Sequence, residues 1–311
     1  MVANSTCHLQ ISKSNWEKNM QYKECDLGSN KTYEEVMGGF LPNLADFYQN
    51  PTKYNIEPFR IFGNLYYVGD KKVCMHLVDT GEGLILFDSG YSHNYDSLIS
   101  SIKQLGFRPE DIKIVIHSHG HFDHFGGGDR LRNSYGAKIL MSKIDTELIK
   151  EMPERALMHL APNENEQICW PDETIQDGDI ISLGNTNVRC VLAPGHTLGT
   201  MAFFFDAVDG EQKLSVGYIG GIGFLSIYKE YCRIYHLPEN KNELLGDTIK
   251  KLQNEKVDIV IGNHPNHNCT IEKRGYMIEN PGTNPFVNSK SWKILLEALE
   301  KRRVDFEKYN N

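Results

Sequence analysis

The chain has 311 residues, of which 40% are hydrophobic, and its formal net charge is −8 at pH 7. A chain of this size and composition can bury a core as one large domain or as two fused halves. The one basic cluster, Lys301–Arg303, lies between acidic residues near the C-terminus, so we expect a solvated helix face and no nucleic-acid surface. No run of about 18 apolar residues occurs, so no membrane span is expected.

The seven cysteines contain no CxxC pair, and their odd number leaves at least one unpaired in a monomer. This pattern favours free thiols in a reducing compartment. Residues 1–7 lack the basic and apolar regions of a secretory signal. We therefore expect a cytoplasmic protein, or a periplasmic or secreted one if a leader has been removed.

Residues 1–57 are polar, and we expect them to form an N-terminal extension that packs partly on the core, with residues 58–311 as the main domain. Within the extension, residues 37–48 are apolar enough to pack near the mouth of an active site. The apolar residues that would either line a substrate groove or pack in the core are Met37, Phe40, Leu41 and Met158.

From residue 59 the sequence predicts alternating strands and helices. Residues 59–88 alternate like a β meander, and residues 95–105 carry apolar side chains at helical spacing. Apolar runs predict buried strands at residues 112–116, 191–193, 214–219 and 259–261. A helix is expected from near Gly127. A last helix is expected from near residues 288–289, with a core stripe of Trp292, Leu295, Leu296 and Leu299.

Residues 118–124 concentrate potential metal ligands, because His119, His121, Asp123 and His124 fall within six residues. Imidazole and carboxylate groups suit Zn²⁺. His119 and His121 are two positions apart, so from an extended strand end their side chains project to the same side. Asp123 and His124 follow after the chain turns and can face a different point. This segment can therefore supply two ligands to each of two metal ions.

Two further histidines follow apolar strands in the same way. His196 lies in Pro-Gly-His after residues 191–193, and His264 follows residues 259–261. Glycine and proline break the chain at both places, so each histidine sits in a loop at a strand end. The strand of residues 84–87 likewise ends at Asp88. We expect these segments to meet at one rim of the fold.

Through residues 86–90, the segment 119–124, the Pro-Gly-His196 motif and His264, the chain resembles the metallo-β-lactamase superfamily over about residues 58–305. The resemblance implies a four-layer αβ/βα sandwich with two zinc ions. It implies that the first zinc takes His119, His121 and His196, and that the second takes Asp123, His124 and His264. Asp88 would accept a ring N–H from a ligand and fix its tautomer, and Thr197 would tie the loop of His196 through its hydroxyl.

One difference from the superfamily pattern narrows the choice among its members. Most hydrolytic members carry a metal-bridging Asp at the end of the strand that corresponds to residues 214–219, whereas here the chain continues into Gly220-Gly221-Ile222-Gly223. Glyoxalase-like, lactonase-like and RNase-like members are therefore disfavoured. The third subclass of metallo-β-lactamases also lacks the bridging residue, but usually has Ser where this chain has Gly220 or Gly221. We expect this difference to loosen the second zinc site.

The ligands predict a hydrolase acting on a small molecule. A zinc-bound water with its pKa lowered toward ~7 would attack a carbonyl, and Asp123 would orient the nucleophile or pass a proton. The favoured reaction is hydrolysis of a β-lactam or a related cyclic amide. The alternatives are a lactonase or thioesterase, an iron-dependent thiol oxygenase using two His and one carboxylate, and a metal-binding protein without catalysis.

The residues that contact the substrate are less specific in sequence. Tyr218 and Tyr228 could donate a hydrogen bond to an oxyanion, although core or rim packing explains each of them as well. His267, three positions after His264, could meet the substrate or replace His264 as a ligand. His117 is expected to be a buried histidine at a strand end, outside the ligand set. No feature of the sequence indicates the oligomeric state.

Overall fold

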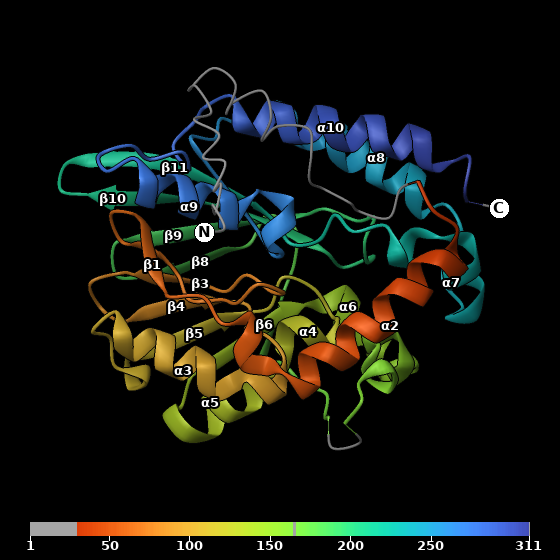
Figure 1. Cartoon of the computed structure of the whole chain (residues 1–311), viewed down its shortest axis with the longest axis horizontal. Helices are drawn as coiled ribbons and strands as arrows, with labels where there is room; N and C mark the ends of the chain where they lie inside the picture. Colours follow the sequence, from red (N-terminus) through yellow and green to blue (C-terminus); the bar gives the residue numbers. More distant parts are fainter. Residues whose placement is uncertain (1–29, 164–165, 311) are drawn as a thin grey trace, which may run out of the picture.

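The computed structural model describes residues 30–163 and 166–310, and two β-sheets form its centre (Figure 1). The first sheet has the order β1-β2-β3-β4-β5-β6-β7. Its strands are β1 (Phe59–Phe62), β2 (Leu65–Tyr67), β3 (His76–Asp79), β4 (Leu84–Phe87), β5 (Ile112–Ile116), β6 (Lys138–Ser142) and β7 (Glu173–Ile175). The second sheet has the order β12-β11-β10-β9-β8. Its strands are β8 (Ile180–Leu183), β9 (Thr186–Leu192), β10 (Met201–Asp209), β11 (Gln212–Ile219) and β12 (Ile259–Gly262).

The direction of the strands explains their composition. β1 to β4 form an antiparallel meander, whereas β4, β5, β6 and β7 run parallel, as do β11 and β12. β4 and β12 are covered on both faces, so they are apolar runs without alternation, and every residue of each is buried.

Aromatic side chains fill the space between the two sheets. Phe87 of β4 packs against Phe203 and Phe205 of β10, with ring centroids 5.5 and 5.2 Å apart, and against the edge of Tyr218 on β11 at 5.8 Å. Large rings buried on the inner faces of both sheets hold the sheets together through apolar contact.

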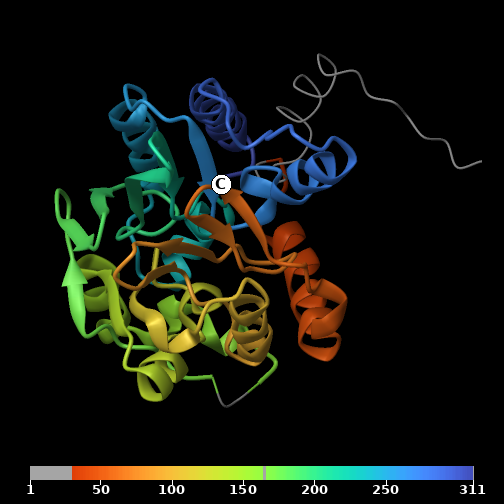
Figure 2. The ribbon, with the colours of Figure 1, turned by 90° about the vertical axis from the view of Figure 1, so that its left-hand side faces the viewer.

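Helices cover the outer faces of both sheets, which gives the predicted four-layer αβ/βα sandwich (Figures 1 and 2). On the side of the first sheet lie α3 (Tyr95–Gln104), α4 (Phe122–Phe125), α5 (Gly128–Tyr135) and α6 (Lys143–Glu151). The remaining helices of the second half are α7 (Lys229–Ile234), α8 (Lys241–Leu252), α9 (Thr270–Glu279) and α10 (Ser291–Phe306). Trp292 of α10 packs on Phe204 of β10, at 5.5 Å between centroids, so the stripe predicted for the last helix does face the core.

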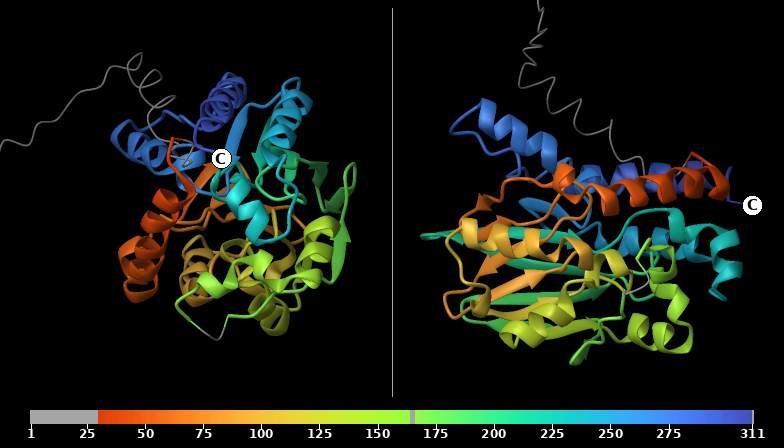
Figure 3. Two further views of the ribbon diagram at one scale, coloured as in Figure 1. Left: turned by 90° about the vertical axis from the view of Figure 1, so that its right-hand side faces the viewer. Right: turned by 60° about the horizontal axis from the view of Figure 1, so that its bottom comes forward.

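Residues ahead of the sandwich form α2 (Tyr33–Gln49), which lies at its side (Figures 2 and 3). Thr32 caps this helix: its hydroxyl accepts from the Glu35 N–H, and the Glu35 carboxylate accepts from the Thr32 N–H at 2.7 Å. Leu44 and Phe47 are buried against the domain. The division of the chain at residues 57 and 58 stays a prediction, and much of residues 1–57 lies outside the described residues.

Within the described ranges, no helix combines the length and apolar character needed to cross a membrane.

Candidate metal centre

Strand ends bring the candidate ligands to one rim of the sandwich. Phe87 of β4 pairs with Ile116 of β5 in parallel, so Asp88 and the segment from His117 leave the sheet side by side. In the second half, Ile219 of β11 pairs in parallel with Gly262 of β12, which places His264 beside the glycine loop that follows β11. His196 lies between β9 and β10.

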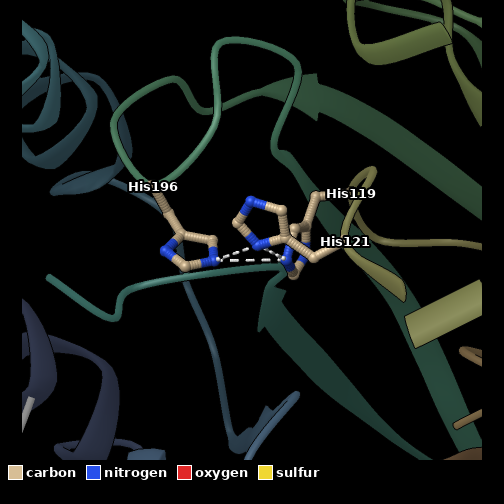
Figure 4. A group of neighbouring side chains, drawn as sticks. All are labelled: His119, His121 and His196. Atoms are coloured by element: carbon tan, nitrogen blue, oxygen red, sulfur yellow. Dashed lines mark hydrogen bonds between the residues drawn. The ribbon is translucent and has the colours of Figure 1, made fainter. Parts of the chain in front are cut away.

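The first ligand group consists of His119, His121 and His196 (Figure 4). Nε2 of His119 lies 3.0 Å from Nδ1 of His121, and Nε2 of His196 lies 3.2 and 3.1 Å from these two atoms. Nitrogens bound to one tetrahedral zinc at about 2.0–2.1 Å are about 3.3–3.4 Å apart. This triangle is close to that size, so the three side chains fit one zinc ion with a position left open.

A second triangle is formed by Asp123, His124 and His264. Nε2 of His124 lies 3.2 Å from Oδ2 of Asp123 and 3.3 Å from Nε2 of His264, and the third side of the triangle is 3.5 Å long. The rings of His119 and His124 are neighbours, with centroids 4.3 Å apart. Two adjacent ions can therefore be held without any residue serving both.

Hydrogen bonds at the opposite ring nitrogens aim the ligand atoms. Nδ1 of His196 lies 2.8 Å from the Gly223 carbonyl oxygen, and Nδ1 of His264 lies 2.7 Å from the Lys72 carbonyl oxygen. A carbonyl only accepts, so each Nδ1 carries the proton and each Nε2 lone pair is free to bind a metal.

Asp88 performs the same task for His124, with Oδ2 of the carboxylate 2.8 Å from Nδ1. The carboxylate also accepts from the Ser118 N–H at 2.7 Å, from the Ser118 hydroxyl at 2.8 Å and from the Tyr218 hydroxyl at 2.6 Å. Its backbone has φ of 58°, a conformation that is uncommon outside glycine. Strain of this kind persists where surrounding contacts fix it.

Burial and neighbouring charges set the protonation of the ligands. Burial lowers the pKa of His196 to about 3 and the pKa values of His119 and His121 well below the usual range. Burial also opposes a charge on His124, but Asp123 and Asp88 raise its pKa to about 10. Burial likewise opposes ionisation of Asp123, yet His124 and His264 lower its pKa. The three histidines of the first group are thus neutral. In the second group, the His124 cation lies between the Asp123 and Asp88 carboxylates, and a bound divalent ion can replace its positive charge.

Two buried charged residues hold the loop of His196, and the sequence analysis missed both. Asp145 accepts from the Gly120 N–H at 2.9 Å, from the Gly199 N–H at 2.8 Å and from the Thr197 hydroxyl at 2.7 Å. The Lys241 ammonium donates to the His196 carbonyl oxygen at 2.7 Å. Asp145 thus ties the loop of the first two ligands to the loop of the third.

A pocket of about 390 Å³ opens above the ligands. His121, Asp123, His196 and His264 line its floor, and α2 lines one wall. The candidate ligand side chains are therefore reachable by a small molecule.

Comparison with known proteins agrees with this geometry. A family model described as the metallo-beta-lactamase superfamily matches residues 69–207. The chain is similar to the metallo-β-lactamase superfamily, as the sequence predicted.

Solved structures and a curated relative extend the match beyond that segment. The native FEZ-1 metallo-beta-lactamase from Legionella gormanii is 29% identical, with a TM-score of 0.72, over 82% of this chain and 97% of that one. The class B3 di-zinc metallo-beta-lactamase LRA-12 from an Alaskan soil metagenome is 26% identical, with a TM-score of 0.67, over 83% and 96%. The hydroxyacylglutathione hydrolase GloC of Haemophilus influenzae is 29% identical over 227 residues, which are 70% of this chain and 93% of GloC. The predicted family and its likeness to the third subclass are confirmed.

The glycine loop after β11 leaves no room for a bridging carboxylate. A Cβ atom at Gly221 would lie 2.4 Å from Cδ2 of His196, and one at Gly220 would lie 2.7 Å from Cβ of Ser118. Any side chain at Gly221 would therefore push against a ligand. In the described ranges, the ligand groups that could hold an ion contain one carboxylate, Asp123.

The two tyrosines named as possible substrate contacts are buried in the structure. Tyr218 is fully buried between the sheets with its hydroxyl on Asp88, and Tyr228 is buried with its hydroxyl on the Lys31 carbonyl. Neither residue lines the pocket, so the structure assigns both to packing and positioning. His267 does line the pocket, beside His264, and its contact with substrate stays a prediction. His117 is buried against the Ser89 hydroxyl, outside both ligand groups.

Proposed function

We propose that this protein is a zinc-dependent hydrolase that holds two zinc ions, one in each ligand triangle. The observation that carries the proposal is the pair of triangles, whose atoms lie 3.0–3.2 Å and 3.2–3.5 Å apart. Bound zinc would supply a Lewis acid for a carbonyl oxygen and lower the pKa of a water molecule to about 7.

The protein's own residues would orient and complete the reaction. The three neutral imidazoles of His119, His121 and His196 leave the charge of an ion uncompensated, which favours an electrophilic site. Asp123 lines the pocket, and its side chain is 14% exposed. It is therefore placed to orient the attacking water and to carry a proton toward the leaving group.

For the substrate we propose a β-lactam or a related cyclic amide. FEZ-1 and LRA-12, both named metallo-beta-lactamases, match this chain over almost their whole length, and the missing bridging carboxylate agrees with the third subclass. The second candidate is an acyl thioester or lactone, because GloC is named a hydroxyacylglutathione hydrolase and 93% of its length is matched.

A hydrolysis panel on zinc-loaded protein tests the proposal. Penicillins, cephalosporins, carbapenems, lactones and acyl thioesters would be compared, with zinc content measured in parallel. We expect turnover of at least one class and a loss of about a hundred-fold or more in His119→Ala and His196→Ala. His159→Ala, at an exposed histidine whose ring contacts the Tyr235 hydroxyl, should keep full activity.

Full turnover in the ligand variants, or zinc bound without turnover of any class, would contradict the proposal. If the protein retains iron and consumes oxygen in the presence of a thiol, it is an oxygenase and the hydrolase proposal is wrong. A cytoplasmic location stays a prediction, which the buried free thiols of Cys74, Cys169, Cys190 and Cys232 support.

A further inference from the structure

The α2 helix forms one wall of the pocket, although it lies outside residues 69–207 that the family model matches. The pocket-lining residues of α2 recur every three or four positions, as one helix face requires. They are Glu35, Val36, Gly39, Phe40, Asn43, Leu44 and Phe47. Leu41, which is next to Phe40 in sequence, faces away and is 42% exposed.

Both ends of α2 are fixed, and they are fixed to different halves of the sandwich. At its start, the Tyr33 ring packs on Tyr228 at 5.6 Å between centroids. At its end, Phe47 packs edge-on against Tyr91 at 5.2 Å, and the Tyr48 hydroxyl donates to Glu166 at 2.7 Å. Tyr228 belongs to the second half and Tyr91 to the first, so the middle of α2 spans the pocket.

The chemistry of the pocket differs between its floor and its walls. The floor carries the ligand side chains, whereas Val36, Phe40 and Leu44 of α2 form an apolar strip on their wall. Polar lining residues lie beside this strip, namely Lys31, Glu35, Asn43 and Lys72. Phe122, Leu157 and Leu225 add further apolar lining. The loop after β11 has glycine at positions 220, 221 and 223, so those positions contribute neither a hydroxyl nor a cation. A substrate with its carbonyl on the floor would place the rest of its acyl part against an apolar surface.

We propose that α2 selects substrates that carry an apolar group on the acyl side of the scissile carbonyl, and that Phe40 is the residue that determines this specificity. The inference rests on the proposed function, because it places the carbonyl at the zinc ligands. A pocket of about 390 Å³ is near the lower end of the usual range for small-molecule sites, about 300–1,000 Å³. It therefore suits a phenyl or hexyl group in preference to a larger one.

Binding of product-like carboxylates tests the proposal without requiring turnover. Acetate, butyrate, hexanoate and phenylacetate would be titrated calorimetrically into the zinc-loaded full chain. Burial of methylene groups predicts that hexanoate and phenylacetate bind at least about ten-fold more tightly than acetate. Phe40→Ala should reduce that ratio to about two-fold or less, whereas Phe40→Leu should keep most of it.

Leu41→Ala is the matched control, because it removes an apolar side chain from the outer face of the same helix, and its ratio should equal that of the unaltered protein. Circular dichroism melting of each variant establishes that the helix is retained. An affinity that does not rise with chain length, or a ratio that Phe40→Ala leaves unchanged, would overturn the proposal. If affinity rises with chain length and loses this dependence in Phe40→Ala while the hydrolysis panel is negative, the proposed hydrolysis is wrong and the role of α2 stands. If the panel shows turnover but affinity does not depend on chain length, the hydrolase proposal stands and the role of α2 is wrong.

Discussion

At the scale of single residues, Asp88 links the metal-binding loop to the core between the sheets. One carboxylate receives donors from β11 (Tyr218), from the residue before the first ligand (Ser118) and from a ligand itself (His124). Burial opposes a charge on Asp88, but His124 and these hydrogen bonds lower its pKa. Asp88 is therefore an anion, and it fixes the ring orientation of His124.

Tyr218→Phe should weaken the second zinc site and leave substrate affinity unchanged. The substitution removes one donor from the buried Asp88 carboxylate while its bond to His124 remains. We expect zinc affinity to fall about ten-fold, at the low end of the effects of outer partners of metal ligands. Competition with a chromophoric chelator measures this affinity, and steady-state kinetics measures KM.

Tyr66→Phe is the control for loss of a tyrosine hydroxyl, because Tyr66 lies on β2 and packs on Phe107 at 5.0 Å, on the helix side of the first sheet. Its zinc affinity should not change. A Tyr218→Phe variant with a raised KM and normal zinc affinity would return Tyr218 to the substrate site.

The sequence indicated the candidate ligands, which the structure brings together, but it missed Asp145 for a physical reason. Histidines clustered at strand ends are themselves a chemical signal. Asp145 instead lies 25 residues beyond Gly120 and binds mainly backbone N–H groups, which any residue provides. The sequence left Tyr218 open between substrate contact and packing because it is near a strand end, and its pairing with Phe203 turns it to the inner face of the sheet.

At the scale of elements, the loop after β11 is shaped by the closeness of His196. A Cβ atom at Gly221 would lie 2.4 Å from His196 Cδ2, whereas one at Gly223 would lie 3.6 Å from His196 Cε1, an ordinary contact. Neither glycine has a positive φ. A difference between alanine substitutions at these two positions would therefore report steric contact and not backbone strain.

Gly221→Ala should displace His196 and lower affinity for the first zinc by about ten-fold or more, because a small misplacement of a ligand costs affinity. Gly223→Ala, the matched control, keeps the carbonyl that accepts from His196 and should bind zinc normally. Zinc titration of both variants measures the effect. Equal zinc affinities would mean that the loop can move away from His196, and the steric account would then be wrong.

The strands and helices that the sequence predicted for the main domain followed from apolar pattern, whereas β6, β7, β8, β10 and α6 to α9 were not predicted. The α2 helix was predicted only in part. The sequence predicted that residues 37–48 pack near the mouth of the site, and the helix that forms there begins at Tyr33. Its start is marked by the pair Thr32 and Glu35, a Thr-x-x-Glu capping signal. The side of α2 that faces the pocket could not be predicted, since that depends on tertiary contacts such as those of Phe47.

At the scale of the whole molecule, each ligand triangle joins the two halves of the sandwich. His119 and His121 follow β5 in the first half, and His196 comes from the second. Asp123 and His124 are likewise completed by His264, after β12. Zinc binding should therefore stabilise the contact between the halves as well as the loops.

Removal of zinc should lower the melting temperature by about 10 °C, because each site at free zinc 100-fold above its Kd contributes about 2.7 kcal/mol and a domain of this size shifts by about 2 °C per kcal/mol. Calorimetry with zinc and with a chelator measures the difference. The double variant His119→Ala/His264→Ala has lost one ligand from each triangle, so its melting temperature should be nearly independent of zinc. If that variant still responds to zinc by several degrees, ions bind outside the two triangles, and the link between the halves has another origin.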